Sequence, residues 1–221
     1  MSRAVTSGPD TMRLARDERA DLADFLATLT PEQWDAPTLC TLWRVRDVVA
    51  HIFSYEDLGL VALVRRFAAA RFNADQVNAV GVAAYAEYGP AELLARVRER
   101  LQPSGLTARF GGQIALTDGL IHHQDIRRAL ALPREVPLDR VQAALRFAPG
   151  ARPIGAPRRL RGLRLAATDL DWSTGDGPTV EGPGEALLIA MAGRPAALPE
   201  LSGPGTPTLA ERITSAASAD H

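Results

Sequence analysis

Segment 118–125, which reads Asp-Gly-Leu-Ile-His-His-Gln-Asp, carries the densest set of side chains in this sequence that could bind a metal ion. In a helix, Asp118, His122 and Asp125 recur after four and then three residues, and therefore share one face. Three such groups are costly to bury without a bound partner, because unpaired buried charge is strongly disfavoured. The spacing therefore indicates a ligand site on this face.

A second segment offers a matching group, since Asp47 and His51 also lie one helical turn apart. Two imidazoles and a carboxylate suit Zn²⁺ or another first-row divalent ion, with one position left open for water or substrate. We therefore predict a divalent metal, with zinc the first choice, held by His51, Asp118 and His122 between two facing helices. Asp47 and Asp125 would accept hydrogen bonds from the imidazole N–H groups.

Simpler explanations exist for the same residues. His51 can be a hydrogen-bonded histidine of the core and Asp118 a surface residue, since His and Asp pairs at this spacing often arise by chance. His123 lies about 100° further round the helix, so we expect it at the surface or in an outer role. Asp125 can equally pair with Arg128 across one turn.

Two other residues could take part in chemistry. Cys40 is the only cysteine, has no histidine near it in the sequence, and is expected to be an unreactive buried thiol. Arg194 follows Gly193 at the end of a predicted helix. It is our candidate for binding a substrate carboxylate, because arginine binds carboxylates bidentately.

Composition narrows the classes of function. The net charge is −1, from 25 basic and 26 acidic residues, which predicts no binding to nucleic acid or to an anionic membrane. Every basic residue is arginine, a bias compatible with the high-GC genome of an actinobacterium. The single cysteine, the absence of an apolar leader at residues 1–10 and the lack of an apolar run long enough to cross a bilayer all favour a cytoplasmic protein.

The elements that would position these residues are mostly helical. Apolar periodicity predicts helices over about 10–30, 43–52, 74–87, 91–101, 110–132 and 138–147, and the second can continue over 60–67 after a break near Gly59. Loop 31–43 contains two tryptophans and is expected to fold over the end of the bundle. After a break rich in proline and glycine at 149–157, strands are predicted at 163–168, 178–181 and 198–202, and helices at 185–193 and 208–213. We predict an antiparallel helical bundle over 1–148 and a small α+β domain over 149–221.

Three sets of motifs resemble a known family. Segments 34–40 and 43–51 form the first, segment 121–130 the second, and segments 167–172, 182–188 and 192–195 the third. Together they are similar to the mycothiol-dependent maleylpyruvate isomerase family, part of the DinB-like superfamily of metal-binding bundles. The resemblance implies a mostly α fold, with a DinB-like up-and-down bundle followed by a small α+β domain.

The resemblance also implies a site and a chemistry. Family members bind one divalent metal, usually zinc, through a histidine matched by His51 and a later Glu-x3-His pair. His122 matches the last ligand, and Asp118 replaces the glutamate with a shorter carboxylate. The metal activates the thiol of mycothiol, and an arginine of the C-terminal domain, for which Arg194 is our candidate, holds the substrate.

The sequence therefore predicts a metal-dependent enzyme that uses mycothiol for isomerisation or thiol S-transfer on a small electrophilic or anionic substrate. Its partners would be that small molecule and the thiol, with no nucleic acid or membrane, in a monomer or a homodimer. The alternative is a non-catalytic metal- or ligand-binding protein of the same fold. A third hypothesis is a purely structural bundle in which His51 and His122 never meet.

Overall fold

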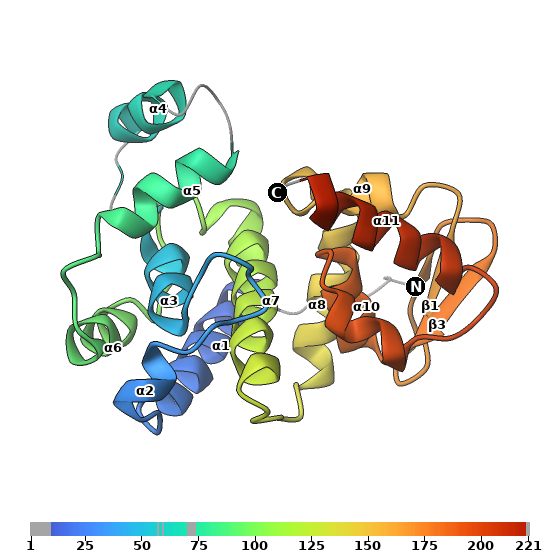
Figure 1. The fold of residues 1–221 in the computed structure, drawn as a ribbon, viewed down its shortest axis with the longest axis horizontal. Helices are drawn as coiled ribbons and strands as arrows, with labels where there is room; N and C mark the ends of the chain where they lie inside the picture. The colour runs from blue at the N-terminus through green and yellow to red at the C-terminus, as the bar shows by residue number, and fades with distance from the viewer. Residues whose placement is uncertain (1–9, 57, 59, 70–73, 220–221) are drawn as a thin grey trace, which may run out of the picture.

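The computed structural model describes residues 10–56, 58, 60–69 and 74–219. The chain forms two lobes, with the long helix α7 between them and helix α8 beside it (Figure 1). The N-terminal lobe consists of α1 (Thr11–Leu26), α2 (Pro31–Trp34), α3 (Val45–Phe53), α4 (Leu60–Ala69), α5 (Ala74–Ala83), α6 (Pro90–Glu99), the 3-10 turn η1 (Arg109–Gly112) and α7 (Gln113–Ala129).

The second lobe mixes short helices with a small sheet. It contains α8 (Leu138–Phe147), η2 (Ala148–Gly150), η3 (Arg152–Ile154), α9 (Ala156–Arg159), β1 (Arg164–Ala167), β2 (Ser173–Thr174), β3 (Thr179–Gly182), α10 (Gly184–Met191), η4 (Pro195–Glu200) and α11 (Thr206–Ala219). The strand order is β2-β1-β3, with β1 antiparallel to β2 and parallel to β3. The predicted mostly α fold with a small mixed C-terminal part is confirmed.

Two predicted elements are wrong. The loop predicted at 31–43 contains the helical turn α2, which Thr30 and Gln33 close with reciprocal side-chain bonds to the backbone. The strand predicted at 198–202 is instead the end of the 3-10 helix η4, because Pro195 and Pro199 fix the backbone φ and remove N–H donors. One residue of that strand, Ser202, pairs with Glu181 in an isolated bridge.

Helix α7 is buried on two sides because each lobe has its own apolar core. Leu116 and Leu120 of α7 belong to a cluster with residues of α8 and α10, whereas Ile126 belongs to a cluster with α3 and α6. This is why the helix lacks a simple polar face. Since α8 contributes to the same core as the C-terminal elements, the domain boundary at 148 stays a prediction.

The start of α7 depends on a glycine. Gly112 has φ +85°, a left-handed conformation that other residues adopt only with strain, and a Cβ there would lie 3.0 Å from the backbone of Met12. This conformation lets the chain enter α7 while packed against the first turn of α1.

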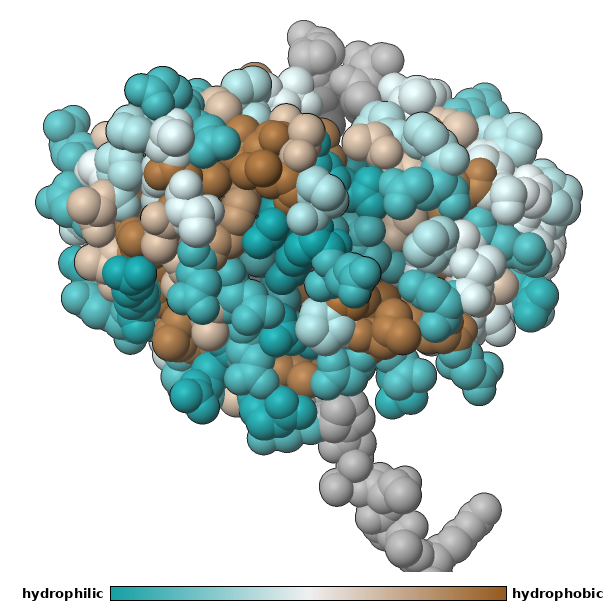
Figure 2. Space-filling model, turned by 90° about the horizontal axis from the view of Figure 1, so that it is seen from below, coloured by the Kyte–Doolittle hydropathy of each residue, from teal (hydrophilic) through white to brown (hydrophobic). Residues whose placement is uncertain are grey.

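The surface in Figure 2 has hydrophilic side chains along its middle, with apolar patches on both sides. Large apolar side chains that are exposed include Leu42, Val61, Val64, Val80, Phe110 and Leu138. None of the described helices combines the length and the apolar character needed to span a bilayer.

Glu18 of α1 is a buried carboxylate that ties α1 to α7 and α8. Its Oε1 accepts from His123 Nδ1 at 2.8 Å and from Arg134 at 2.5 Å, and its Oε2 accepts from Arg140 at 2.9 Å. His123 accepts from Arg127 through Nε2, which leaves the proton on Nδ1. Of the two roles expected for His123, the surface position is wrong, since the side chain is fully buried on the second covered face of α7.

We predict that acid destabilises the protein through Glu18. Burial raises the pKa of this carboxyl, but the His123 hydrogen bond and the Arg134 charge outweigh burial and lower the pKa from 4.5 to about 2. A depressed folded-state pKa stabilises the protein above pH 4.5, and that stability is lost as the pH falls towards 2. The urea midpoint, followed by circular dichroism across this range, should fall accordingly.

Substitution of Glu18 tests the assignment. Glu18→Gln should lower the free energy of unfolding at pH 7 by about 3 kcal/mol, because it leaves buried arginines uncompensated. Asp21 also pairs with Arg140 but is 46% exposed, so Asp21→Asn should cost less than about 1 kcal/mol. Equal losses in the two variants would contradict the special role of Glu18.

Candidate metal centre

Helix α3 positions His51, and its first turn determines what Asp47 does. Asp47 accepts from the backbone N–H of Arg44 at 2.9 Å and pairs with the Arg44 side chain, so it caps the helix. The expectation that Asp47 accepts a hydrogen bond from His51 is therefore wrong. One helical turn further on, His51 is buried with its ring against Trp43, with the two ring centroids 4.7 Å apart.

The structure brings together the three residues predicted to bind a metal. Asp118 and His122 lie one turn apart on α7, facing His51 on α3, and one ligand atom from each lies within 4.8 Å of the others. Asp118 Oδ1 is 3.5 Å from His122 Nε2 and 4.0 Å from His51 Nε2. Both histidines are buried, whereas 32% of the Asp118 side chain is exposed. The cluster therefore opens to solvent at Asp118.

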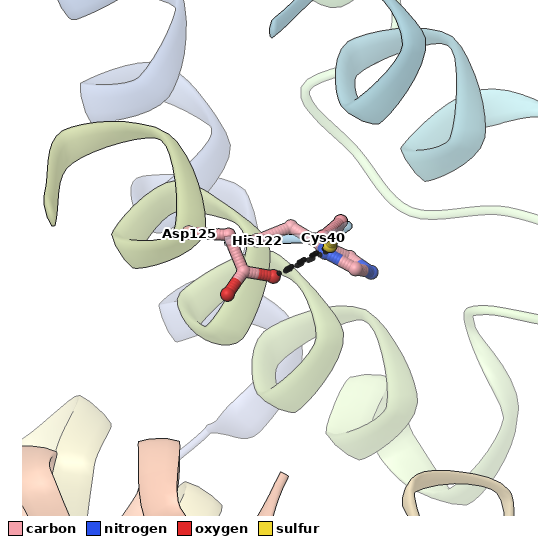
Figure 3. A group of neighbouring side chains, drawn as sticks. All are labelled: Cys40, His122 and Asp125. Atoms are coloured by element: carbon pink, nitrogen blue, oxygen red, sulfur yellow. Dashed lines mark hydrogen bonds and ion pairs between the residues drawn. The ribbon is translucent and has the colours of Figure 1, made fainter. Parts of the chain in front are cut away.

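Behind this cluster lies Asp125, whose side chain is completely buried. Its Oδ2 is 3.0 Å from His122 Nδ1 and accepts from the Cys40 thiol at 3.0 Å, and the carboxylate points towards both residues in Figure 3. This contact holds the imidazole with Nε2 directed at Asp118. Arg128 pairs with Glu185 instead, so the alternative pairing of Asp125 with Arg128 is not seen.

Arg194, which follows α10 and directly precedes η4, reaches this site from the second lobe. Its Nε donates to Asp125 Oδ1 at 2.9 Å and its Nη2 to Asp125 Oδ2 at 2.7 Å, a bidentate pair. Nη2 also donates to Cys40 Sγ at 3.2 Å, and Nη1 to the Ala192 carbonyl at 2.7 Å. The carboxylate of Asp125 thus occupies the place at Arg194 where we expected the substrate carboxylate to bind.

Sequence reasoning missed the position of Cys40. The loop before α3 turns back on itself, with Trp43 N–H donating to the Cys40 carbonyl at 2.8 Å, and Leu39 N–H donates to the Asp125 carbonyl at 3.2 Å. These bonds hold the half-buried thiol beside His122 and Asp125. The two tryptophans in this short loop did indicate that the loop packs against the bundle. They gave no indication that the Cys40 thiol belongs to the site.

The charges of the cluster are strongly coupled. Burial and the neighbouring His122 lower the pKa of His51 to about 3. Burial also lowers the pKa of His122, but Asp118 and Asp125 outweigh it and raise this pKa well above its usual value. Burial raises the pKa of Asp118, but His122 and His51 outweigh burial and hold it at about 2. At neutral pH His122 is therefore the positively charged histidine of the pair and His51 is neutral, and a metal ion would displace the proton on His122 Nε2.

The donor set fits a tetrahedral metal ion. With bonds of about 2.0–2.2 Å, two ligand atoms in such a site lie about 3.3–3.6 Å apart. The separations of 3.5 Å and 4.0 Å from Asp118 Oδ1 to the two Nε2 atoms are close to this range. Although aspartate is shorter than glutamate, Asp118 Oδ1 therefore lies close enough to both histidines to share a metal ion with them.

The fold and the cluster together define a helical bundle with a candidate metal centre between α3 and α7. Residues 15–104 match the family model described as the mycothiol maleylpyruvate isomerase N-terminal domain. This domain match confirms, over these residues, the resemblance found in the motifs. The matched segment contains His51 and ends before Asp118 and His122.

Two solved structures share the fold over most of the chain. One is the crystal structure of the mycothiol-dependent maleylpyruvate isomerase, with a TM-score of 0.54, and the other is that of a histidine-to-alanine mutant, with a TM-score of 0.53. Each is 14% identical to this chain and covers 90% of it, and the match covers 94% of each solved chain. At this identity the likeness shows a common fold. A comparison with curated proteins gives no match.

We predict that Asp125→Asn destabilises the protein by about 3 kcal/mol, because it leaves the mostly buried guanidinium of Arg194 without its counter-charge. Urea unfolding at pH 7 measures the loss. The control is Asp35→Asn, since Asp35 pairs with Arg44 and Arg46 but is 50% exposed, and it should cost less than about 1 kcal/mol. A smaller loss for Asp125→Asn than for the control would refute the prediction.

Proposed function

We propose that this protein is a metal-dependent enzyme that uses the thiol of mycothiol to isomerise a small anionic substrate or to transfer the thiol to a small electrophile. The proposal depends on the convergence of ligand atoms from His51, Asp118 and His122 within 4.8 Å. The family of residues 15–104, together with the fold shared with a maleylpyruvate isomerase, supports mycothiol as the cosubstrate.

The metal that we expect is zinc, held by Nε2 of His51, Nε2 of His122 and Oδ1 of Asp118. A zinc ion there would lower the pKa of a bound thiol, so that the nucleophilic thiolate is available at neutral pH. The fourth position of a tetrahedral site is left for that thiol. The exposed edge of Asp118 marks the direction from which thiol and substrate would enter.

The remaining residues prepare the site. Asp125 accepts the Nδ1 proton of His122 and so keeps the Nε2 lone pair directed at the cluster. Trp43 covers the ring of His51 and excludes water from that side. Arg194 holds Asp125 in place, which makes it a positioning residue.

A contact between Arg194 and the substrate remains part of the proposal. One N–H of its Nη1 donates to the Ala192 carbonyl, and the second is the group that a substrate carboxylate could use. The Arg194 side chain is 20% exposed, so a ligand can reach it.

One observation favours the alternative of a non-catalytic metal- or ligand-binding protein. The bidentate pair with Asp125 takes up most of the hydrogen-bonding capacity of Arg194. In a protein that only binds metal, the pair would serve stability alone. Metal analysis does not separate the two functions, but a thiol assay does.

We predict that the purified protein contains about one divalent ion per chain and that His51→Ala loses it, because one of three protein ligands is removed. Elemental analysis by mass spectrometry gives the metal content. Cys40→Ser is the matched control, since Cys40, His122 and Asp125 form a second possible donor set that shares His122 with the first. Retention of metal in His51→Ala and its loss in Cys40→Ser would assign the ion to the second set instead.

We predict that the wild-type protein isomerises maleylpyruvate or consumes mycothiol with an electrophile such as 1-chloro-2,4-dinitrobenzene, and that Asp125→Asn lowers kcat/KM about 10- to 100-fold through misorientation of His122. Both reactions can be followed by absorbance. Asp47→Asn, one turn before His51 but bonded to Arg44, should keep wild-type activity. A metal-loaded wild type without activity would favour the non-catalytic alternative.

A further inference from the structure

Arg66 of α4 is a buried cation whose described partners are all uncharged. The residue is 8% exposed. Its Nε donates to the Val77 carbonyl at 2.7 Å, its Nη1 to the Ser54 carbonyl at 2.8 Å and its Nη2 to Ser54 Oγ at 3.3 Å. These bonds use three of the five guanidinium N–H groups. A buried charge normally requires a counter-charge, so this environment is suited to an anion that binds from outside the chain.

The fold makes room for this guanidinium. Gly81 lies inside α5, where glycine costs about 1 kcal/mol relative to alanine. A Cβ at this position would overlap the guanidinium of Arg66, so the glycine has a packing reason. On another side, Arg66 lies over the ring of Tyr55, 4.5 Å from its centroid. The cation is therefore held between α4 and α5. These two helices lie at the edge of the N-terminal lobe (Figure 1).

A cavity of about 410 Å³ borders Arg66, a size typical of sites for small molecules. Arg96 of α6 contributes a second guanidinium, which is 37% exposed and lies 3.6 Å from Glu99. The other walls are mostly apolar or aromatic. They include Leu58, Val80, Tyr85 and Tyr88.

The cavity is separate from the candidate metal centre but linked to it. None of the three predicted metal ligands lines it. Tyr55 lies between the two, since its ring contacts the His51 ring edge to face with the centroids 5.9 Å apart and carries Arg66 on its face. An anion on Arg66 would therefore lie one aromatic ring away from a ligand of the candidate metal centre.

We propose that this cavity binds a small organic anion, a carboxylate with an apolar or aromatic body. The carboxylate would accept from the remaining N–H groups of Arg66, and the body would pack between Tyr85, Tyr88 and Val80. Bidentate binding to a planar carboxylate is the interaction for which arginine is best shaped. The proposal goes beyond the proposed function and does not require the metal centre to be active.

Isothermal titration calorimetry of the wild-type protein with benzoate, and with its neutral analogue benzamide, tests the proposal. Benzoate should bind at least about tenfold more tightly than benzamide, since only benzoate compensates the buried cation. Arg66→Gln should weaken benzoate binding by a similar factor. The control is Arg65→Gln, which makes the same charge change at the neighbouring exposed arginine of α4 and should leave binding intact.

Two further variants keep the test decisive. Ala84→Leu, directly after the end of α5, fills part of the cavity and should weaken benzoate binding without removing a charge, which decides the matter if Arg66→Gln does not fold. His51→Ala should retain benzoate binding, and its loss would place benzoate at the metal centre. Equal binding of benzoate and benzamide, or equal losses in Arg65→Gln and Arg66→Gln, would overturn the proposal.

Discussion

The arrangement of the candidate metal centre depends on one buried carboxylate, that of Asp125. A carboxylate without water is stable only where opposite charge and hydrogen-bond donors surround it. Asp125 has Arg194 from the second lobe, His122 from its own helix and Cys40 from the loop before α3. One charge thus fixes the relative positions of three segments that are distant in the sequence. The orientation of His122 towards Asp118 follows from that arrangement.

Buried ionic contacts recur along α7 because this helix is covered on two sides. His123 faces Glu18 of α1, while Gln124 donates to Glu185 of α10 at 2.7 Å. Polar groups in such a position must find partners within the protein, since water cannot supply them. The same helix therefore carries the contacts between the lobes and two of the three proposed metal ligands. This explains why the site lies where the two apolar cores meet.

Sequence patterns predicted the parts of the molecule that depend on local spacing. The periodicity of apolar residues located α1, α3, α7 and α8 to within a few residues, and the i, i+4 spacing brought Asp118 and His122 to one face. The contacts of Asp125 could not be predicted in this way, because Cys40 lies 85 residues and Arg194 69 residues from it. His123 was misplaced because a single-face pattern assumes that one side of a helix meets water. Asp47 does not contact His51 because its carboxylate instead accepts from the backbone N–H of Arg44, which has no partner within the helix.

The pair of Asp125 and Arg194 has a consequence for how such proteins can evolve. The bundle does not neutralise the buried charge of Asp125 by itself, since Arg194, the cation that pairs with this carboxylate, belongs to the other lobe. A recombination event that exchanged the C-terminal segment would have to bring an arginine to the same place or change position 125 at the same time. The two lobes are therefore expected to be inherited as one unit, although only residues 15–104 match the family model of the N-terminal domain.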